Sequence, residues 1–179
     1  MIKISSGIYR SRQIQTPNQD TIPTKNRVRE AMMSMVYPYL NGANVLDLFA
    51  GSGALGIEAL SRGAAKATLV DASLEAWNVI RENLRTLKET RATLIHADYL
   101  QAIAGFKEPF DLVFLDPPYA LKESYQNSIN ALLSKGLLSK ECAIVLEYEG
   151  ELDIDSSAFA SRRDYTYGKT KVILLRDLL

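Results

Sequence analysis

The chain has 179 residues, 47% of them hydrophobic, and its 21 basic and 21 acidic side chains leave no net charge. This length and apolar content predict one domain with a substantial core and exclude a disordered chain. The single cysteine, Cys142, excludes an intramolecular disulfide and a cysteine-clustered metal site. The N-terminus has no signal-peptide pattern, and no apolar run approaches the roughly 18 residues that span a bilayer. We therefore expect a cytoplasmic protein that does not contact a membrane.

The charges are unevenly distributed along the chain. Residues 1–40 carry a net charge of plus four, so the remainder carries minus four. A small domain that is polarised in this way can bind phosphates even when its total charge is zero. The basic residues of this segment are Lys3, Arg10, Arg12, Lys25, Arg27 and Arg29.

The first 42 residues predict a hairpin and a helix. Apolar and polar residues alternate over residues 2–14 around Gly7, which is typical of a small hairpin. Thr24 is a candidate cap for a helix that begins at Lys25. The apolar face of this helix consists of Val28, Met32, Met35, Val36 and Tyr39, before Pro38 and Gly42 end it. We treat residues 1–42 as an N-terminal extension and residues 43–179 as the main domain.

From Asn44 onward, strands and helices alternate. Strand patterns occupy residues 44–49, 66–70, 91–95, 110–115 and 142–148, and helical patterns occupy residues 54–63, 73–87 and about 123–135. This alternation predicts an α/β fold with right-handed crossovers and an open parallel sheet. Residues 162–175 instead resemble two strands joined around Gly168, which predicts a terminal hairpin with an antiparallel edge.

An aspartate lies at or near the carboxyl end of each of the first four strands of this region. Because ligands of open α/β sheets bind at the carboxyl ends of the strands, we expect these acids to line one crevice. The four acids are Asp47, Asp71, Asp98 and Asp116.

A glycine-rich segment lies between the first of these strands and its helix. Gly51, Gly53 and Gly56 have the G-x-G-x-x-G spacing, and Asp71 follows 20 positions after Gly51, as in nicotinamide-dinucleotide sites. A carboxylate at Asp47 would repel a pyrophosphate but attract an ammonium group. S-adenosylmethionine carries an ammonium, a sulfonium and an adenosine but no phosphate. We therefore favour this cofactor over a dinucleotide.

The segment FDLVFLDPPYA (110–120) places an acid and two prolines directly after a buried strand. The side chain of Asp116 and the carbonyl of Pro117 could both accept hydrogen bonds from an exocyclic amine and aim its lone pair at a methyl group. Pro118 would make the turn rigid, and Tyr119 could stack on a base that has left its own stack.

These motifs resemble a known enzyme class. DLFAGSG (47–53), Asp71, Asp98 and DPPY (116–119) are similar to the class I S-adenosylmethionine-dependent methyltransferases that modify an exocyclic nitrogen. Four longer segments, which together cover nearly the whole chain, resemble the RsmD-type bacterial 16S ribosomal RNA guanine-N2 methyltransferases. These segments are PTKNRVREA (23–31), DLFAGSGALGIEALSRGA (47–64), FDLVFLDPPY (110–119) and YGKT (167–170).

The resemblance implies a Rossmann-like, seven-stranded, mostly parallel sheet with a C-terminal antiparallel hairpin. It also implies a monomer that methylates one guanine of 16S ribosomal RNA within an assembled or assembling small subunit, with residues 1–42 contacting RNA and residues 43–179 forming the methyltransferase domain. The chain departs from the family pattern at Asp71, where many relatives have glutamate, and at residues 5–7, where SSG replaces the usual AG.

The resemblance also implies a set of site residues. Gly51 and Gly53 would approach the methionine part of the cofactor, Asp71 its ribose, and Asp98 its adenine. We expect no metal, because His96 is the only histidine. The expected cofactor-binding residues are Asp47, Phe49, Gly51, Ser52, Gly53, Asp71, Ala72, Asp98 and Tyr99; the catalytic ones are Asp116, Pro117, Pro118 and Tyr119; the RNA-binding ones are Arg10, Arg12, Arg27 and Arg29.

Three alternatives stay open on the sequence. A related D/N-PP-Y loop serves adenine N6 methylation in DNA. The glycine spacing together with Asp71 also fits a nicotinamide-dependent oxidoreductase. The fold could finally belong to a ribosome-assembly factor that binds RNA without catalysis.

Overall fold

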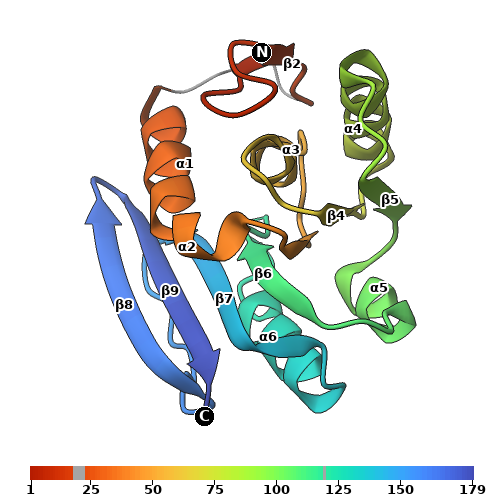
Figure 1. Cartoon of the computed structure of the whole chain (residues 1–179). Helices are drawn as coiled ribbons and strands as arrows, with labels where there is room; N and C mark the ends of the chain where they lie inside the picture. The colour runs from red at the N-terminus through yellow and green to blue at the C-terminus, as the bar shows by residue number, and fades with distance from the viewer. Residues whose placement is uncertain (18–22, 119) are drawn as a thin grey trace.

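The computed structural model describes residues 1–17, 23–118 and 120–179, and a seven-stranded sheet lies at its centre (Figure 1). The strands are β3 (Asn44–Asp47), β4 (Lys66–Asp71), β5 (Ala92–His96), β6 (Phe110–Leu115), β7 (Leu138–Glu149), β8 (Phe159–Tyr167) and β9 (Thr170–Leu178). They lie in the order β5-β4-β3-β6-β7-β9-β8. Strands β3 to β7 are parallel, whereas β9 is antiparallel to both β7 and β8. The predicted parallel sheet with a C-terminal antiparallel hairpin is confirmed.

Helices cover both faces of the sheet (Figure 1). One face packs against α1 (Pro23–Met35), α2 (Tyr37–Leu40), α3 (Ala54–Ser61) and α4 (Leu74–Leu87), and the other against α5 (Tyr99–Gly105) and α6 (Ser124–Ser134). Strand β6 shows why the central strands are apolar throughout. Leu112 and Phe114 pack in the α1–α3 cluster, whereas Val113 and Leu115 pack in the α5–α6 cluster. Each residue of such a strand faces a helix layer.

The helices differ from the sequence predictions in three places. The one helix predicted from Lys25, with an apolar face that includes Tyr39, is two helices, α1 and α2, which are separated at Val36. Helix α1 begins at Pro23, so Thr24 is a helical residue and not the cap that precedes the helix. Helix α5 was not predicted, and the Asp98 carboxylate caps it by accepting a hydrogen bond from the N–H of Leu100 at 3.0 Å. The predicted cap of α4 is confirmed, because the Ser73 hydroxyl accepts from the N–H of Ala76.

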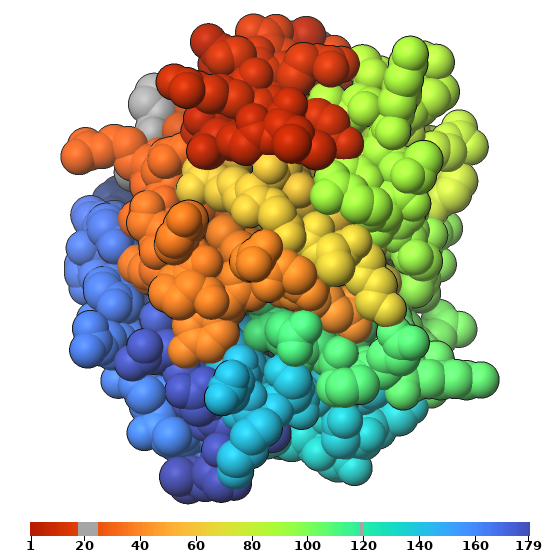
Figure 2. Space-filling model, in the orientation of Figure 1, coloured from red at the N-terminus to blue at the C-terminus, as the bar shows by residue number. Residues whose placement is uncertain are grey.

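Residues 1–17 form a small unit that packs on α3 and α4. The two-residue strands β1 (Ile2–Lys3) and β2 (Gln13–Ile14) pair antiparallel, which confirms the predicted hairpin. Figure 2 shows this segment lying directly against the surface of both helices. Ile4 and Ile14 are almost completely buried in a cluster that includes Ile57 of α3 and Ile80 of α4.

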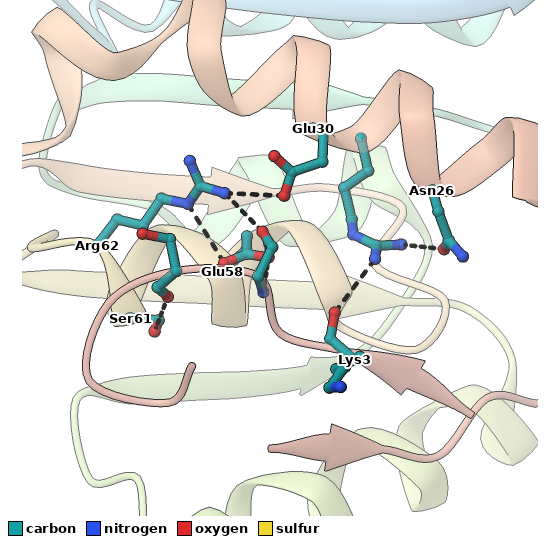
Figure 3. A network of polar contacts seen from close by, with 9 residues as sticks. Lys3, Asn26, Glu30, Glu58, Ser61 and Arg62 are labelled. Atoms are coloured by element: carbon teal, nitrogen blue, oxygen red, sulfur yellow. Dashed lines mark hydrogen bonds and ion pairs between the residues drawn. The ribbon is translucent and has the colours of Figure 1, made fainter. Parts of the chain in front are cut away.

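A buried carboxylate fixes the extension to α3. Glu58 is fully buried, and one of its oxygens accepts from the backbone N–H and the hydroxyl of Ser5 at 2.9 and 2.7 Å. Arg62 donates to Glu58, to Ser5 and to Glu30 of α1, and Figure 3 shows its guanidinium between the two carboxylates. We call Ser5, Glu30, Glu58 and Arg62 the Glu58 cluster. Losing one partner would leave a buried charge unpaired, which is costly.

Gly7 makes the closest approach between the extension and α3. Its φ is +87°, and a Cβ atom there would lie 1.8 Å from the carbonyl oxygen of Ser61. The same carbonyl accepts from the N–H of Ile8 at 2.9 Å, and the Ser61 hydroxyl donates to the carbonyl of Ser6 at 2.6 Å. Only glycine fits both the left-handed conformation and this contact.

Asp47 connects the end of β3 to the first turn of α3. Its side chain is 2% exposed, and Oδ2 accepts from the N–H of Gly56 at 3.0 Å. Burial raises the pKa of Asp47 to about 7, and the nearby Asp71 carboxylate adds to the increase, although the Gly56 hydrogen bond opposes it. The contact between strand and helix is tight, because a Cβ at Gly56 would lie 2.3 Å from Cδ2 of the buried Leu69.

We expect Gly7→Ala to destabilise the protein more than Gly42→Ala does. Gly42 also has a positive φ, +72°, but a Cβ atom added there would have no other atom within 4 Å. Both variants incur the left-handed backbone cost of about 1–2 kcal/mol, and the overpacking at Gly7 adds about 1–3 kcal/mol. Urea unfolding measures the difference in the free energy of unfolding. Equal losses in the two variants would show that the contact with Ser61 is unimportant.

The raised pKa of Asp47 predicts a pH-dependent stability difference. The folded state keeps the Asp47 proton up to about pH 7, whereas an ordinary aspartate loses it near pH 3.8, so stability is lost as the pH rises through this interval. Asn in place of Asp47 keeps an acceptor for the Gly56 N–H and does not titrate. We expect Asp47→Asn to gain about 2–4 kcal/mol over the wild type between pH 4 and pH 8.

Urea unfolding at several pH values tests this expectation, with Asp153→Asn as the control for loss of an exposed carboxylate. A constant difference between Asp47→Asn and the wild type across the range would contradict it.

Candidate functional site

A cavity of about 480 Å³ opens at the carboxyl ends of the parallel strands. Each of these strands contributes to its wall, because parallel strands all end at the same edge of a sheet. The contributing residues include Phe49 and Gly51 after β3, Asp71 of β4, Asp98 after β5, Asp116 after β6 and Glu147 of β7. The structure therefore brings three of the four predicted strand-end acids into one cavity.

Backbone hydrogen bonds fix the glycine loop at one side of the cavity. Gly51 and Gly53 have φ values of +59° and +82°, which allow the sharp turn into α3. The N–H of Gly51 donates to one oxygen of Asp71 at 2.9 Å, and the N–H of Ser73 donates to the other at 2.8 Å. A carboxylate has about four acceptor positions, so Asp71 can hold the loop and still accept from a ligand hydroxyl.

Three predicted cofactor residues of this loop do not line the cavity. We expected Asp47 to face a ligand ammonium, but its carboxylate is buried beneath the loop and accepts from Gly56 of α3. The Ser52 hydroxyl accepts from the N–H of Ala54, and Gly53 is buried at the start of α3. These residues support the shape of the loop, and Gly51 forms the part of it that meets the cavity.

An aromatic surface lies beside Asp98. The rings of Phe49 and Tyr99 are 5.3 Å apart at an angle of 44°, and both line the cavity together with Ala72. Asp98 uses one oxygen to cap α5. Its other oxygen leaves an acceptor next to an apolar surface, which is an arrangement suited to a heteroaromatic ring that carries an amino group.

The segment after β6 forms another side of the cavity. Asp116, Pro117 and Pro118 all line it, and Pro117 is buried. The carbonyl of Pro118 accepts from the N–H of Leu121 at 2.9 Å, so this carbonyl is used within the loop. Tyr119, the predicted stacking residue, lies outside the described residues.

Asp116 lies next to Glu147, a residue that the sequence analysis did not identify. Their carboxyl groups interact with each other, and Lys25 of α1 lies near both. The Asp116 side chain is exposed toward the cavity, whereas protein atoms surround it on its other sides and remove water from it. This desolvation, together with the charge of Glu147, raises the pKa of Asp116 well above its usual range. Desolvation also raises the pKa of Glu147. The pair therefore retains a proton more readily than two separate carboxylates would.

The structure separates the four predicted RNA-binding arginines into two groups. Arg10, Arg12 and Arg27 are exposed, and within the described part of the chain the side chains of Arg10 and Arg27 make no hydrogen bond. Arg12 donates to the carbonyl of Thr86 at 3.2 Å, and Arg29 donates to Asn26 and to the carbonyl of Lys3. Burial lowers the pKa of Arg29, which is half-buried between the extension and the sheet. Arg12 and Arg29 thus have contacts within the protein.

Two further classes of feature were searched in the described part of the chain. No group of three or more histidine, cysteine, aspartate or glutamate side chains there could hold a metal ion. Among the same residues, no helix has the length and apolar character needed to cross a membrane.

Comparisons with known proteins identify the family of the chain. A family model described as "Conserved hypothetical protein 95" matches residues 2–176. "Ribosomal RNA small subunit methyltransferase D" of Escherichia coli strain K12 is 38% identical over 84% of this chain and 76% of its own length. The protein of the same name from Haemophilus influenzae is 35% identical, over 83% of this chain and 79% of its own.

Solved structures show the same fold. The yhhF protein of Escherichia coli superimposes with a TM-score of 0.88 and 34% identity, covering 99% of both chains. A T. thermophilus 16S rRNA N2 G1207 methyltransferase, solved in complex with AdoMet and guanosine, has a TM-score of 0.72 at 21% identity. That match covers 89% of this chain and 44% of the other, and it shows the likeness of fold. On the evidence of the family match and the two sequence relatives, the chain belongs to the ribosomal RNA small subunit methyltransferase D family.

Proposed function

We propose that this protein transfers a methyl group from S-adenosylmethionine to the exocyclic N2 of a guanine in 16S ribosomal RNA, within an assembled or assembling small subunit. The observation that carries the proposal is the single cavity that joins the glycine loop to the Asp116-Pro117 segment. The names of the relatives support ribosomal RNA of the small subunit as the substrate. Membership of a methyltransferase family argues against the nicotinamide-dependent alternative.

The cavity residues suit S-adenosylmethionine. The volume of about 480 Å³ lies in the range of small-molecule sites. Asp71 can accept from the ribose hydroxyls, and Asp98 with the Phe49–Tyr99 surface can hold the adenine. Gly51 lets the backbone approach the methionine part, since the space beside it is open. When bound, the cofactor supplies a methyl carbon on a sulfonium, which is strongly electrophilic.

Asp116 and Pro117 prepare the nitrogen for attack. The lone pair of an exocyclic amine is delocalised into the base, so the free amine is a poor nucleophile. Two acceptors, the Asp116 carboxylate and the Pro117 carbonyl, favour a tetrahedral nitrogen whose lone pair points at the methyl group. Preorganised groups of this kind contribute about 3 kcal/mol each to transition-state stabilisation. As the new bond makes the nitrogen cationic, the raised pKa of Asp116 suits it to take the proton that leaves.

Residues 1–42 are our proposed RNA-contacting extension, with residues 43–179 as the methyltransferase domain of a monomeric enzyme. The exposed Arg10 and Arg27 are the proposed phosphate contacts. Arg12 and Arg29 would act mainly by holding the extension in place. Tyr119 keeps its proposed role of stacking on the target base.

Transfer of a labelled methyl group tests the proposal directly. Small subunits from cells that lack the gene, protein-free 16S RNA and DNA are each incubated with the protein and labelled S-adenosylmethionine. We expect N2-methylguanosine in the ribosomal RNA after digestion and mass spectrometry. Label found only as N6-methyladenine in DNA would support the DNA methyltransferase alternative, and RNA binding without any transfer would support a non-catalytic assembly factor.

We expect Asp116→Ala to lower the turnover number by about 100-fold or more. Asp116→Asn should lower it less, because the amide keeps an acceptor oxygen but cannot take the proton. The affinity for S-adenosylmethionine, measured by calorimetry, should change little, because the loss concerns the amine and not the cofactor. Asp153→Asn removes an exposed carboxylate outside the cavity and should retain full activity. Normal turnover in both Asp116 variants would show that this side chain does not act on the amine.

The exposed arginines should affect binding of the RNA and not the chemical step. We expect Arg10→Glu to raise KM for small subunits, to leave the turnover number nearly unchanged, and to lower the salt slope of binding by about one. The control is Lys107→Glu, since Lys107 is exposed and precedes β6, at the sheet edge opposite the cavity. Equal effects of the two variants would remove Arg10 from the RNA interface.

A further inference from the structure

Three charged side chains from three elements meet at the Asp116 side of the cavity. Asp116 follows β6, Glu147 lies near the end of β7, and Lys25 lies in the first turn of α1, and all three line the cavity. The first has a proposed role on the amine. Lys25 is a hydrogen-bond donor and Glu147 is a hydrogen-bond acceptor. The proposed function has not yet assigned a role to either residue.

The register of the sheet places the two acids side by side. Leu115 of β6 is paired with Leu146 of β7, and the strands run parallel. Asp116 follows Leu115, and Glu147 follows Leu146. The two acids therefore lie beside each other at the carboxyl edge of the sheet. The Tyr125 hydroxyl of α6 donates to the backbone carbonyl of Glu147 at 2.5 Å and fixes this part of β7.

The charges around the pair come from α1 and β7. Lys25 lies close to both carboxyl groups, and Arg29, one helical turn further along α1, interacts with Glu147. Glu149, two residues along β7, adds a negative charge near Glu147. Two adjacent carboxyl groups in a partly desolvated wall are costly unless hydrogen-bond donors face them. Lys25 supplies one set of donors, and a ligand with two adjacent N–H groups would supply the rest.

Guanine has the matching pattern. Its Watson–Crick edge presents the N2 amine, the N1–H and the O6 oxygen in order, which are donor, donor and acceptor. We propose that Glu147 and Lys25 determine the specificity for guanine: Asp116 accepts from the N2 amine, Glu147 accepts from N1–H, and Lys25 donates to O6. This inference rests on the proposed function, because it requires guanine to be the base in the cavity.

The same arrangement disfavours adenine. Adenine presents a lone pair at N1, and with its N6 amine at Asp116 the lone pair would face the carboxylate of Glu147. An acceptor that meets an acceptor loses a hydrogen bond and adds repulsion, so it discriminates against the wrong base. Glu147 therefore serves both as a contact for guanine and as a barrier to adenine.

Free nucleosides that differ by single groups test each contact. Binding of guanosine, inosine and 2-aminopurine riboside is measured by calorimetry with the protein saturated by S-adenosylhomocysteine. Inosine lacks the N2 amine but keeps N1–H and O6, whereas 2-aminopurine riboside keeps the amine and lacks both of the others. We expect the wild-type protein to bind guanosine more tightly than either analogue.

Variants then assign the groups. Glu147→Gln should weaken guanosine and inosine about tenfold, the equivalent of one lost charged hydrogen bond. It should not weaken 2-aminopurine riboside and should strengthen its binding, because the N1 lone pair of this analogue no longer faces a carboxylate. Lys25→Met should show the same selectivity, and it changes an exposed side chain, so it carries the test even if the Glu147 variant fails to fold. Glu141→Gln, at the other end of β7, is the matched control and should change none of the three affinities.

Several results would overturn the inference. One is a wild-type protein that binds guanosine no more tightly than 2-aminopurine riboside. Another is a folded Glu147 or Lys25 variant whose affinity falls equally for all three nucleosides, or for none of them. If small subunits are methylated at guanine N2 and the nucleoside preferences are unaffected by these variants, the proposed function stands and this inference alone fails. If the wild-type protein transfers no methyl group to ribosomal RNA, the proposed function fails.

Discussion

The parallel direction of β3 to β7 is the constraint on which the site depends. Because every one of these strands ends at the same edge, acids that are far apart in the chain must share one small region. Most of them are satisfied by backbone N–H groups: Asp47 by Gly56, Asp71 by Gly51, and Asp98 by Leu100. These acids thereby shape the loops around the cavity.

Asp116 and Glu147 differ from the other strand-end acids, because their carboxyl groups interact with each other and with Lys25. The groups around these two acids are therefore side chains, which can rearrange around a ligand. A backbone-capped carboxylate has little freedom to do so. This contrast divides the edge into a part that holds the protein together and a part suited to reacting with a bound base.

Helix α1 connects the N-terminal extension to this reactive part. Arg29 donates to the carbonyl of Lys3 in β1, and its guanidinium interacts with Glu58 and with Glu147. Lys25, one turn earlier, lines the cavity. The Glu58 cluster fixes the extension against α3 and Glu30 of α1 (Figure 3). Docking of the extension and placement of the Lys25 ammonium are consequently properties of the same helix.

The sequence was sufficient for much of the fold. Apolar runs covered on both faces, separated by amphipathic helices, predicted the parallel sheet, and Gly168 predicted the terminal hairpin. Helix α5 was missed because seven residues carry too little periodicity, and the acid at its start was interpreted only as a ligand group. Strand-end acids could be placed at one edge, but the direction of each side chain could not. Asp47 points beneath the loop to Gly56, which depends on how α3 packs on β3.

Glu147 shows why the rest of the site could not be predicted. It lies within an apolar strand pattern, and only the pairing of β7 with β6 shows that it lies beside Asp116. That pairing is irregular: Phe110 is opposite Leu138, yet Leu112 is opposite Ala143, so the register shifts between the two positions. Counting from the start of each strand would therefore place the wrong β7 residue beside Asp116. Local sequence carries no signal for such a shift, because it arises from the twist and bending of the assembled sheet.

The carboxyl pair also shows that the site opposes the stability of the fold. Both pKa values are raised in the folded protein, so the stability that comes with the retained proton is lost as the pH rises through them. Near neutral pH the pair therefore destabilises the folded state, and Lys25 offsets only part of that cost. A core leucine at position 147 would avoid it but would present no acceptor. The two carboxylates are unfavourable in the empty cavity, and a ligand that brings hydrogen-bond donors to them compensates this cost. The wall is therefore selective for a base edge with two adjacent N–H groups.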